Sequence, residues 1–296
     1  MKVDPRNLVL NLLLGAAAQR LSAREAVASC ELFGIRENSV RVALARLSAA
    51  GLVEAVDRGE YRLGPRAASL AADVATWRRV QDKVREWSGQ WVAVHVGGLG
   101  RSDRTALRVR ARALDLLGLR ELARGLFVRP DNLAGGAAAV GERLRKLGLE
   151  PQAAVFVAHG LDEAHERRAA ALWDGEALTR GYRATRARLE EWLERAGTLA
   201  PDAAARESFL LGNDAIRQLV FDPLLPAPLV DVEARRAFVE AVVRFDAAGH
   251  AIWDRFLQGG AARRPHPRGR LVLAAAGAAR TPERRAAVTS TLETTP

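Results

Sequence analysis

Residues 37–47, ENSVRVALARL, decide the fold of the first sixty residues. Their apolar members Val40, Ala43, Leu44 and Leu47 recur every three or four positions, which is the spacing of a helix with one buried face. Gly51 follows shortly afterwards, and glycine is the residue that most often ends a helix. We therefore predict a helix over about residues 37–50, with polar and basic side chains on its open side.

The residues before this helix predict two further helices. Residues 5–18 begin with Pro5, which suits a first helical turn, and continue with leucines at helical spacing. Ser22 and Glu25 stand three apart, as in a capping box, so a short helix is expected to start there and to stop before Gly34.

The residues after it predict a β-hairpin. Residues 52–56 and 61–63 read as two short strands, and the turn residues Asp57-Arg58-Gly59-Glu60 join them. Helix, short helix, helix and hairpin, in this order, predict a winged helix-turn-helix over residues 5–66. A small helical subdomain with an unrelated hairpin is the alternative.

A winged helix-turn-helix binds DNA by placing the second helix of the motif in the major groove. Residues on the open side of the 37–50 helix are therefore the predicted DNA contacts: Asn38, Ser39, Arg41, Val42 and Arg46. Arg58, at the tip of the hairpin, is the predicted wing contact. The net charge of +10 also favours an acidic partner such as double-stranded DNA. An ordinary solvated face is the alternative for these arginines.

The rest of the chain predicts an α+β multidomain protein. We expect a polar connector helix over residues 67–90, its helical pattern ending near Trp87, then a ferredoxin-like α+β domain over 91–160. In that domain three strands, near 91–96, 127–129 and 153–157, alternate with helices at 105–117 and 138–147. A helical C-terminal domain, broken at 222–228, is expected over 161–258, and a flexible tail over 259–296.

Six stretches of the chain resemble the PaaX family of repressors, in order from residue 33 to residue 226. They are Phe33–Leu47, Gly51-Leu52-Val53, Trp87–Trp91, Gly125–Leu133, Leu172-Trp173-Asp174 and Phe221–Pro226. The resemblance implies a homodimeric transcription repressor with the three domains predicted above. It also implies control of aromatic-acid catabolism, such as that of phenylacetate, with release from DNA by an aryl-CoA thioester.

The chain departs from the family pattern at three places. Arg36 stands where the family usually has serine, so capping of the 37–50 helix is expected to pass to Asn38 or another group. The wing is short and lacks the extra basic residues often seen there. The tryptophan that the family carries shortly after the Asp222–Pro226 turn is absent.

An acyl-CoA effector needs a cation for its phosphates and an apolar slot for its acyl part. Arg129 is the predicted cation, with Trp91, His95 and Trp173 as walls of the slot. The alternative is that the tryptophans are core residues and that Arg129 pairs with Asp131 or Asp174. The connector helix is the expected route by which the ligand would respace the reading helices of a dimer.

The sequence predicts neither an enzyme nor a cofactor. His159 and His165 lack the spacing that places two histidines on one helix face, and the single cysteine, Cys30, reads as a packed residue. No signal peptide is apparent, and the apolar run near residues 8–18 is too short to cross a bilayer, so we expect a cytoplasmic protein. A winged-helix architectural or protein-interaction factor without a small-molecule effector is the alternative function.

Overall fold

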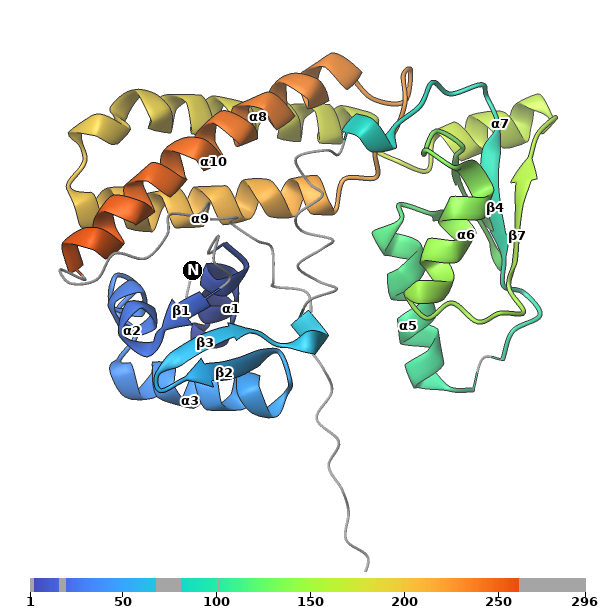
Figure 1. Cartoon of the computed structure of the whole chain (residues 1–296). Coiled ribbons are helices and arrows are strands. Elements are labelled where there is room, and N and C mark those ends of the chain that lie inside the picture. The colour runs from blue at the N-terminus through green and yellow to red at the C-terminus, as the bar shows by residue number, and fades with distance from the viewer. Residues whose placement is uncertain (1–2, 16–19, 68–80, 101, 261–296) are drawn as a thin grey trace, which may run out of the picture.

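The computed structural model describes residues 3–15, 20–67, 81–100 and 102–260 (Figure 1). It is a mixed structure of helices with two small antiparallel sheets, one of three strands and one of four. An N-terminal unit and a middle unit each contain one sheet, and three long helices make up most of the C-terminal unit. Among the described residues no helix is both long enough and apolar enough to cross a membrane.

The N-terminal unit packs three helices against the small sheet. The helices are α1 (Pro5–Gly15), α2 (Ala23–Glu31) and α3 (Glu37–Ala49); the strands are β1 (Arg20–Ser22), β2 (Val53–Asp57) and β3 (Glu60–Leu63), in the order β1-β3-β2. The predicted helices and hairpin are all present. Strand β1 was not predicted, because three residues are too few to reveal the alternation of a strand.

The core of this unit is made by the apolar stripes that the sequence shows. Leu8, Leu12 and Leu13 of α1 are buried together with Val40 and Leu44 of α3. The predicted capping box starts α2. The hydroxyl of Ser22 accepts a hydrogen bond from the Glu25 backbone N–H at 3.1 Å, and the Glu25 carboxylate accepts one from the Ser22 N–H at 2.8 Å.

The middle unit is a four-stranded antiparallel sheet with two helices on one face. Its elements in chain order are β4 (Trp91–His95), α5 (Arg104–Leu116), β5 (Arg120–Ala123), β6 (Leu126–Pro130), α6 (Gly136–Lys146) and β7 (Ala154–Ala158). The strand order is β5-β6-β4-β7. Val92 and Val94 of β4 point to the face that α5 and α6 cover, where they meet Leu114 and Leu144. Strand β5 was not predicted, since Leu122 is its only large apolar residue.

The C-terminal unit is helical, as the sequence predicts. It contains α7 (Glu163–Ala170), α8 (Gly175–Arg195), a short 3-10 helix η3 (Ala196–Thr198), α9 (Pro201–Val220) and α10 (Val232–Gly260). The three long helices pack side by side (Figure 1). Stacked and tilted aromatic pairs lie between them, among them Tyr182–Phe238 and Trp192–Phe245. The predicted break separates α9 from α10.

The predicted connector helix is wrong over its last residues. Residues 68–80 lie outside the described residues. Residues 81–83 form a short 3-10 helix, η2 (Gln81–Lys83), and residues 84–90 are not helical. The cause is a pairing with the loop that follows β6: Arg85 donates its backbone N–H to the carbonyl of Asn132 at 2.8 Å, and Val84 forms a β-bridge with Leu133. Of the predicted tail, residues 259–260 belong to α10 and residues 261–296 lie outside the described residues.

The N-terminal unit contacts α9, and the middle unit contacts the loop after it. The ring of Phe33, just after α2, packs edge-on against Phe209 of α9 with ring centroids 5.3 Å apart. Asn11 donates a side-chain hydrogen bond to Asn213 at 3.3 Å. The middle unit contacts the loop instead. Gly118 lies so close to Pro223 that an added Cβ would come within 2.8 Å of the proline ring.

Candidate nucleic-acid interface

Helix α3 presents a continuous open face. Its buried side is Val40, Ala43, Leu44 and Leu47, as predicted, because these residues pack on α1 and α2. The five residues predicted to contact DNA are all exposed: Asn38, Ser39, Arg41, Val42 and Arg46. The side chain of Val42 is 44% exposed although it is apolar. The helix therefore offers hydrogen-bonding groups, cations and one apolar group to a partner.

The first turn of α3 has no side-chain cap. Arg36 occupies the N-cap position and makes no capping hydrogen bond, and Asn38 does not take over this role. The backbone N–H of Ser39 donates to the Arg36 carbonyl at 2.9 Å. Those of Glu37 and Asn38 have no acceptor in a preceding helical turn, and together with the helix dipole they favour an anion. The start of α3, with exposed Asn38 and Ser39, is therefore suited to a phosphate.

The two arginines on the open face of α3 differ in whether a carboxylate engages them. Arg41 donates through Nε to the Glu37 carboxylate at 2.9 Å, so a carboxylate one turn away engages its guanidinium. Arg46 borders an open groove of about 320 Å³ between α3 and the start of α1. Asp4 and Arg6 line the same groove. Sequence reasoning missed these two residues, because only the packing of α1 on α3 brings them to the face.

The wing carries less positive charge than its arginines suggest. Arg58 is exposed at the turn between β2 and β3, where Gly59 adopts a φ of +82° that favours glycine. Arg62 pairs with Glu54 across the hairpin, and Arg20 of β1 lies 3.7 Å from Glu60. These acids neutralise Arg62 and Arg20, so Arg58 is the exposed cation at the tip of the hairpin.

Two of the predicted effector residues are packed in the interior. The ring of Trp91 is fully buried and stacks on Trp173, with centroids 6.1 Å apart and planes 5° from parallel. Its indole N–H donates to Glu166 at 3.0 Å, and that of Trp173 donates to the carbonyl of Gly118 at 3.1 Å. Both tryptophans therefore have the core role that was their alternative interpretation.

Arg129 is a buried cross-link between the middle unit and the loop after α9. Its guanidinium is 2% exposed and donates to Asn132 Oδ1 and to the carbonyl of Pro223, both at 3.1 Å. Burial lowers the pKa of Arg129 to about 10, opposed by the charges of Asp131 and Asp222. The alternative that it pairs with Asp131 or Asp174 is not observed; Asp131 forms its ion pair with Arg85 at 2.7 Å.

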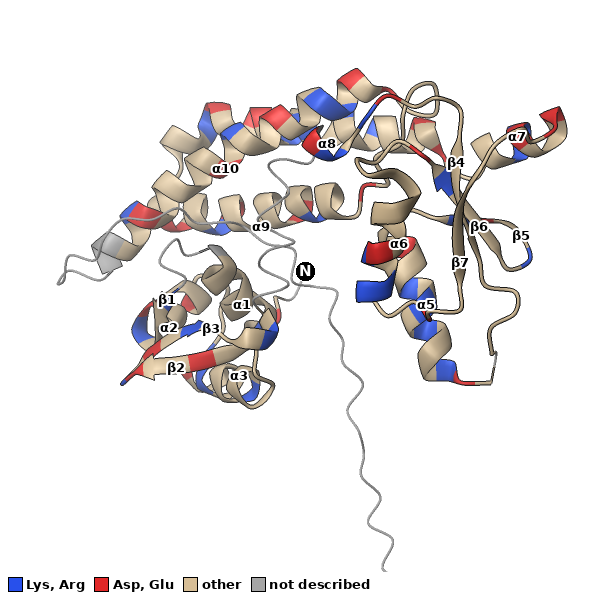
Figure 2. Ribbon diagram, turned by 45° about the vertical axis from the view of Figure 1, so that its right-hand side comes forward, with Lys and Arg blue, Asp and Glu red and all other residues tan. Residues whose placement is uncertain are grey.

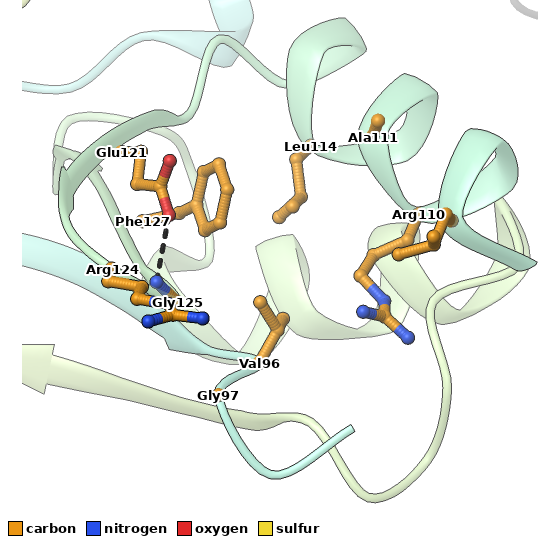
Figure 3. Close-up of a pocket in the computed structure, with 10 residues that line it drawn as sticks. Val96, Gly97, Arg110, Ala111, Leu114, Glu121, Arg124, Gly125 and Phe127 are labelled. Carbon is orange, nitrogen blue, oxygen red and sulfur yellow. Dashed lines mark hydrogen bonds between the residues drawn. The ribbon is translucent and has the colours of Figure 1, made fainter. Parts of the chain in front are cut away.

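His95 lies at the other end of β4, beside an open cavity of about 420 Å³. The cavity lies between α5 and the β5–β6 hairpin, and its apolar lining includes Val96, Leu114 and Phe127 (Figure 3). The lining also contains Gly97, against which the His95 ring packs. Sequence reasoning gave no sign of this cavity, because residues far apart in the chain form it.

Two arginines line the cavity, and they differ in exposure and ion pairing. Arg110 is held by a bidentate pair with Glu150 and is nearly buried. Arg124 is exposed at the rim and makes no ion pair with another described residue. The carboxylate of Glu121 accepts a hydrogen bond from the Gly125 N–H at 2.8 Å, which ties down the hairpin turn (Figure 3). The cavity thus combines an apolar interior with a cation at its mouth.

The histidines and the cysteine considered in the sequence each have a separate local setting. Among the described residues, no cluster of three or more histidine, cysteine, aspartate or glutamate side chains is arranged to hold a metal. Burial raises the pKa of the Cys30 thiol to about 12, so it stays protonated at neutral pH and is a poor nucleophile. His165 bonds to Asp162, the cap of α7, at 2.7 Å, and His159 is exposed.

Comparison with known proteins gives two family matches and a similar structure. No curated protein matches the chain. A solved structure of an uncharacterized protein from Mycobacterium tuberculosis is similar, with 25% sequence identity and a TM-score of 0.56 over 85% of this chain and 97% of that one. Residues 4–67 match the family described as PaaX-like protein, and residues 173–255 match the PaaX-like protein C-terminal domain. These matches agree with the resemblance seen in the sequence, and the chain belongs to the PaaX family of regulators.

Proposed function

We propose that the chain is a sequence-specific DNA-binding repressor of the PaaX type and that α3 is its reading helix. The observation that carries the proposal is the open face of α3, where an uncapped helix start lies beside two arginines. Backbone N–H groups and arginines bind phosphate, and arginine also recognises guanine edges in the major groove. The order of α2, α3 and the β2–β3 hairpin supports a winged helix-turn-helix.

The middle unit is proposed to be ferredoxin-like. A β-α-β-β-α-β chain order, with the strands arranged as β5-β6-β4-β7 and both helices on one face, supports this fold. Such a domain would connect the reading unit to the C-terminal helices. The family match supports a cytoplasmic homodimer that acts on a gene cluster for aromatic-acid catabolism, without enzymatic activity of its own. It does not favour a purely architectural factor.

The effector is proposed to be an aryl-CoA thioester. Trp91, Arg129 and Trp173 are buried in this structure, so a ligand would reach them only after a rearrangement. The cavity beside His95 needs no such rearrangement, because it is open and its size lies in the range of small-molecule sites. The exposed guanidinium of Arg124 would meet an anionic group, and Phe127 and Leu114 would contact an aromatic acyl group.

The test is operator retardation with a variant of the reading helix. The operator is a duplex that the wild-type protein selects from a random pool. Arg41→Ala combined with Arg46→Ala should weaken specific binding by at least about tenfold, since contacts to bases are each worth about 1–3 kcal/mol. Arg180→Ala with Arg188→Ala, on exposed positions of α8, removes the same charge and is the matched control. Equal binding by the two double variants would contradict the assignment of α3.

The effector is tested in the same assay. Phenylacetyl-CoA should release the wild-type protein from the selected duplex, and Arg124→Gln should raise the concentration needed. If Arg124→Gln responds as the wild type does, the cavity is not the effector site. If no aryl-CoA thioester releases the protein, the effector class itself is wrong, while the assignment of α3 is unaffected.

A further inference from the structure

Helix α5 carries a row of arginines that neither the fold nor the proposed reading helix uses. Arg104, Arg108 and Arg112 stand four residues apart, so they follow one line along the helix surface. All three are exposed, while Ala113 and Leu114 of the same helix are buried against the sheet. We call these three residues the α5 arginine row.

The row differs from most of the arginines on α8. There, Arg180, Arg183, Arg186 and Arg195 each pair with a carboxylate. No such ion pair is found for the three arginines of the row within the described part of the chain. The fourth arginine of α5, Arg110, points the other way and is neutralised by Glu150.

Further positive charge lies next to the row. Val109 of α5 packs against Gly148, just after α6, so the last turn of α6 comes close to α5. That turn contains Arg145 and Lys146, and Lys146 pairs with Glu142. On α5 itself Asp115 is exposed, and it forms an ion pair with Arg120 at 2.7 Å. The outer side of the two helices is therefore strongly basic, as the blue segments in Figure 2 show.

The position of α5 suits a shared partner with α3. Figures 1 and 2 differ by a turn about the vertical axis, and in both the start of α5 and helix α3 lie at the lower side of the molecule. A duplex lying along the open face of α3 and running toward the middle unit would pass beneath the start of α5.

We propose that the α5 arginine row is a second DNA-binding surface, which contacts the phosphate backbone beyond the bases read by α3. This inference rests on the proposed function, because it assigns further contacts to the same partner. The row extends about 12 Å at 1.5 Å per residue. One strand of a duplex carries a phosphate about every 3.4 Å of its axis, so several phosphates lie within reach of the row. Such contacts add affinity and salt dependence without sequence specificity.

The experiment measures the dissociation constant of the full chain on DNA at several salt concentrations. Two duplexes are used: a minimal selected site, and the same site extended by one helical turn on each side. The row variant is Arg104→Gln with Arg108→Gln and Arg112→Gln, since glutamine keeps the helix propensity of arginine. The control variant is Arg180→Gln with Arg188→Gln and Arg206→Gln, three exposed positions of α8 and α9 with the same change in net charge.

The wild-type protein should bind the extended duplex more tightly than the minimal one, and the row variant should lose that gain. For the row variant, the slope of log Kd against log salt on the extended duplex should fall by up to about 2.7, from about 0.9 for each lost phosphate contact. Its selectivity for the site over unrelated DNA should not change. Circular dichroism establishes that both variants are folded.

Two outcomes separate this inference from the proposed function. If the row variant and the control variant have equal slopes on the extended duplex, the row is not a DNA surface, and α3 keeps its role. If the wild-type protein selects no duplex at all, the proposed function fails, and the row loses its partner with it.

Discussion

At the scale of single residues, the positive charge that α3 offers to a partner depends on which arginine is already paired with a carboxylate. Arg41 shares its charge with Glu37, whereas Arg46 borders an open groove. To contact a partner through the groups bonded to Glu37, Arg41 must leave this carboxylate, and an exposed pair of this kind is worth about 0.2–1 kcal/mol.

Glu37→Gln should therefore strengthen DNA binding. We expect the dissociation constant to fall about two- to fivefold at low salt, in line with the strength of an exposed ion pair. Retardation of the selected duplex measures the effect, which should shrink as salt is added because screening weakens the pair. Combining Glu37→Gln with Arg41→Ala should abolish the gain. A gain that survives without Arg41 would mean that the carboxylate acts on the DNA directly.

Some of these residues could be predicted from the sequence, and others could not. The exposed residues of α3 follow from the helical period, because the buried stripe determines which side chains are left open. The role of Arg129 does not follow, since its acceptors on Asn132 and Pro223 are set by how the middle unit meets the loop after α9. The same holds for Trp91 and Trp173, whose stacking depends on that docking.

At the scale of elements, helix α2 owes its start to two side chains. The capping box satisfies backbone donors at both Ser22 and Glu25, which the helix itself leaves without acceptors. Strand β1 ends at the same residue, so the cap also fixes where the sheet gives way to the helix.

Ser22→Ala should lower the free energy of unfolding by about 1 kcal/mol, the usual cost of losing an N-cap. Thermal and urea denaturation followed by circular dichroism measure it. Ser39→Ala is the matched control, because Ser39 is exposed on α3 and caps no helix. Equal losses for both variants would mean that the capping box does not stabilise the fold.

The elements that the sequence did not predict have one property in common. They form through hydrogen bonds with neighbouring segments, and their own residues show no periodic pattern. Strands β1 and β5 have three and four residues, and each exists because a longer neighbouring strand supplies the hydrogen bonds. Residues 84–90 are polar enough to suggest a solvated helix, yet the loop after β6 captures their backbone. A long element with a full periodic stripe, such as α3, was predicted correctly. The C-terminal unit was predicted only as helical with one break, so the separate ends of α7, α8 and α9 were not.

At the scale of the whole molecule, the N-terminal unit is docked on α9 by a small contact. Phe33 meets Phe209, which in turn packs against Trp253 of α10 with centroids 6.2 Å apart. This aromatic chain leads from the reading unit into the C-terminal core. Aromatic pairs of this geometry are worth about 0.5–1.5 kcal/mol beyond the area they bury.

Phe33→Ala should loosen that docking more than it disturbs either unit. We expect the N-terminal unit to unfold at a lower temperature than the rest, with loss of hydrogen-exchange protection in α1 to α3 and little change in α8 to α10. Phe156→Ala is the matched control, since Phe156 of β7 is 44% exposed and belongs to the other sheet. A uniform loss of protection over the whole chain would contradict a separable docking contact.

Helix α9 lies between the contact with the N-terminal unit and the contact with the middle unit. The N-terminal unit contacts it at Phe209, and the middle unit contacts Pro223, just beyond its end. At 1.5 Å per residue the two contacts are roughly 20 Å apart along the chain. A tilt of about 10° about the Pro223 end would move the Phe209 end by about 3.5 Å, which is close to the step of about 3.4 Å between phosphates along one strand. If the N-terminal unit binds DNA as proposed, a small tilt of α9 would shift it by one phosphate step along the duplex.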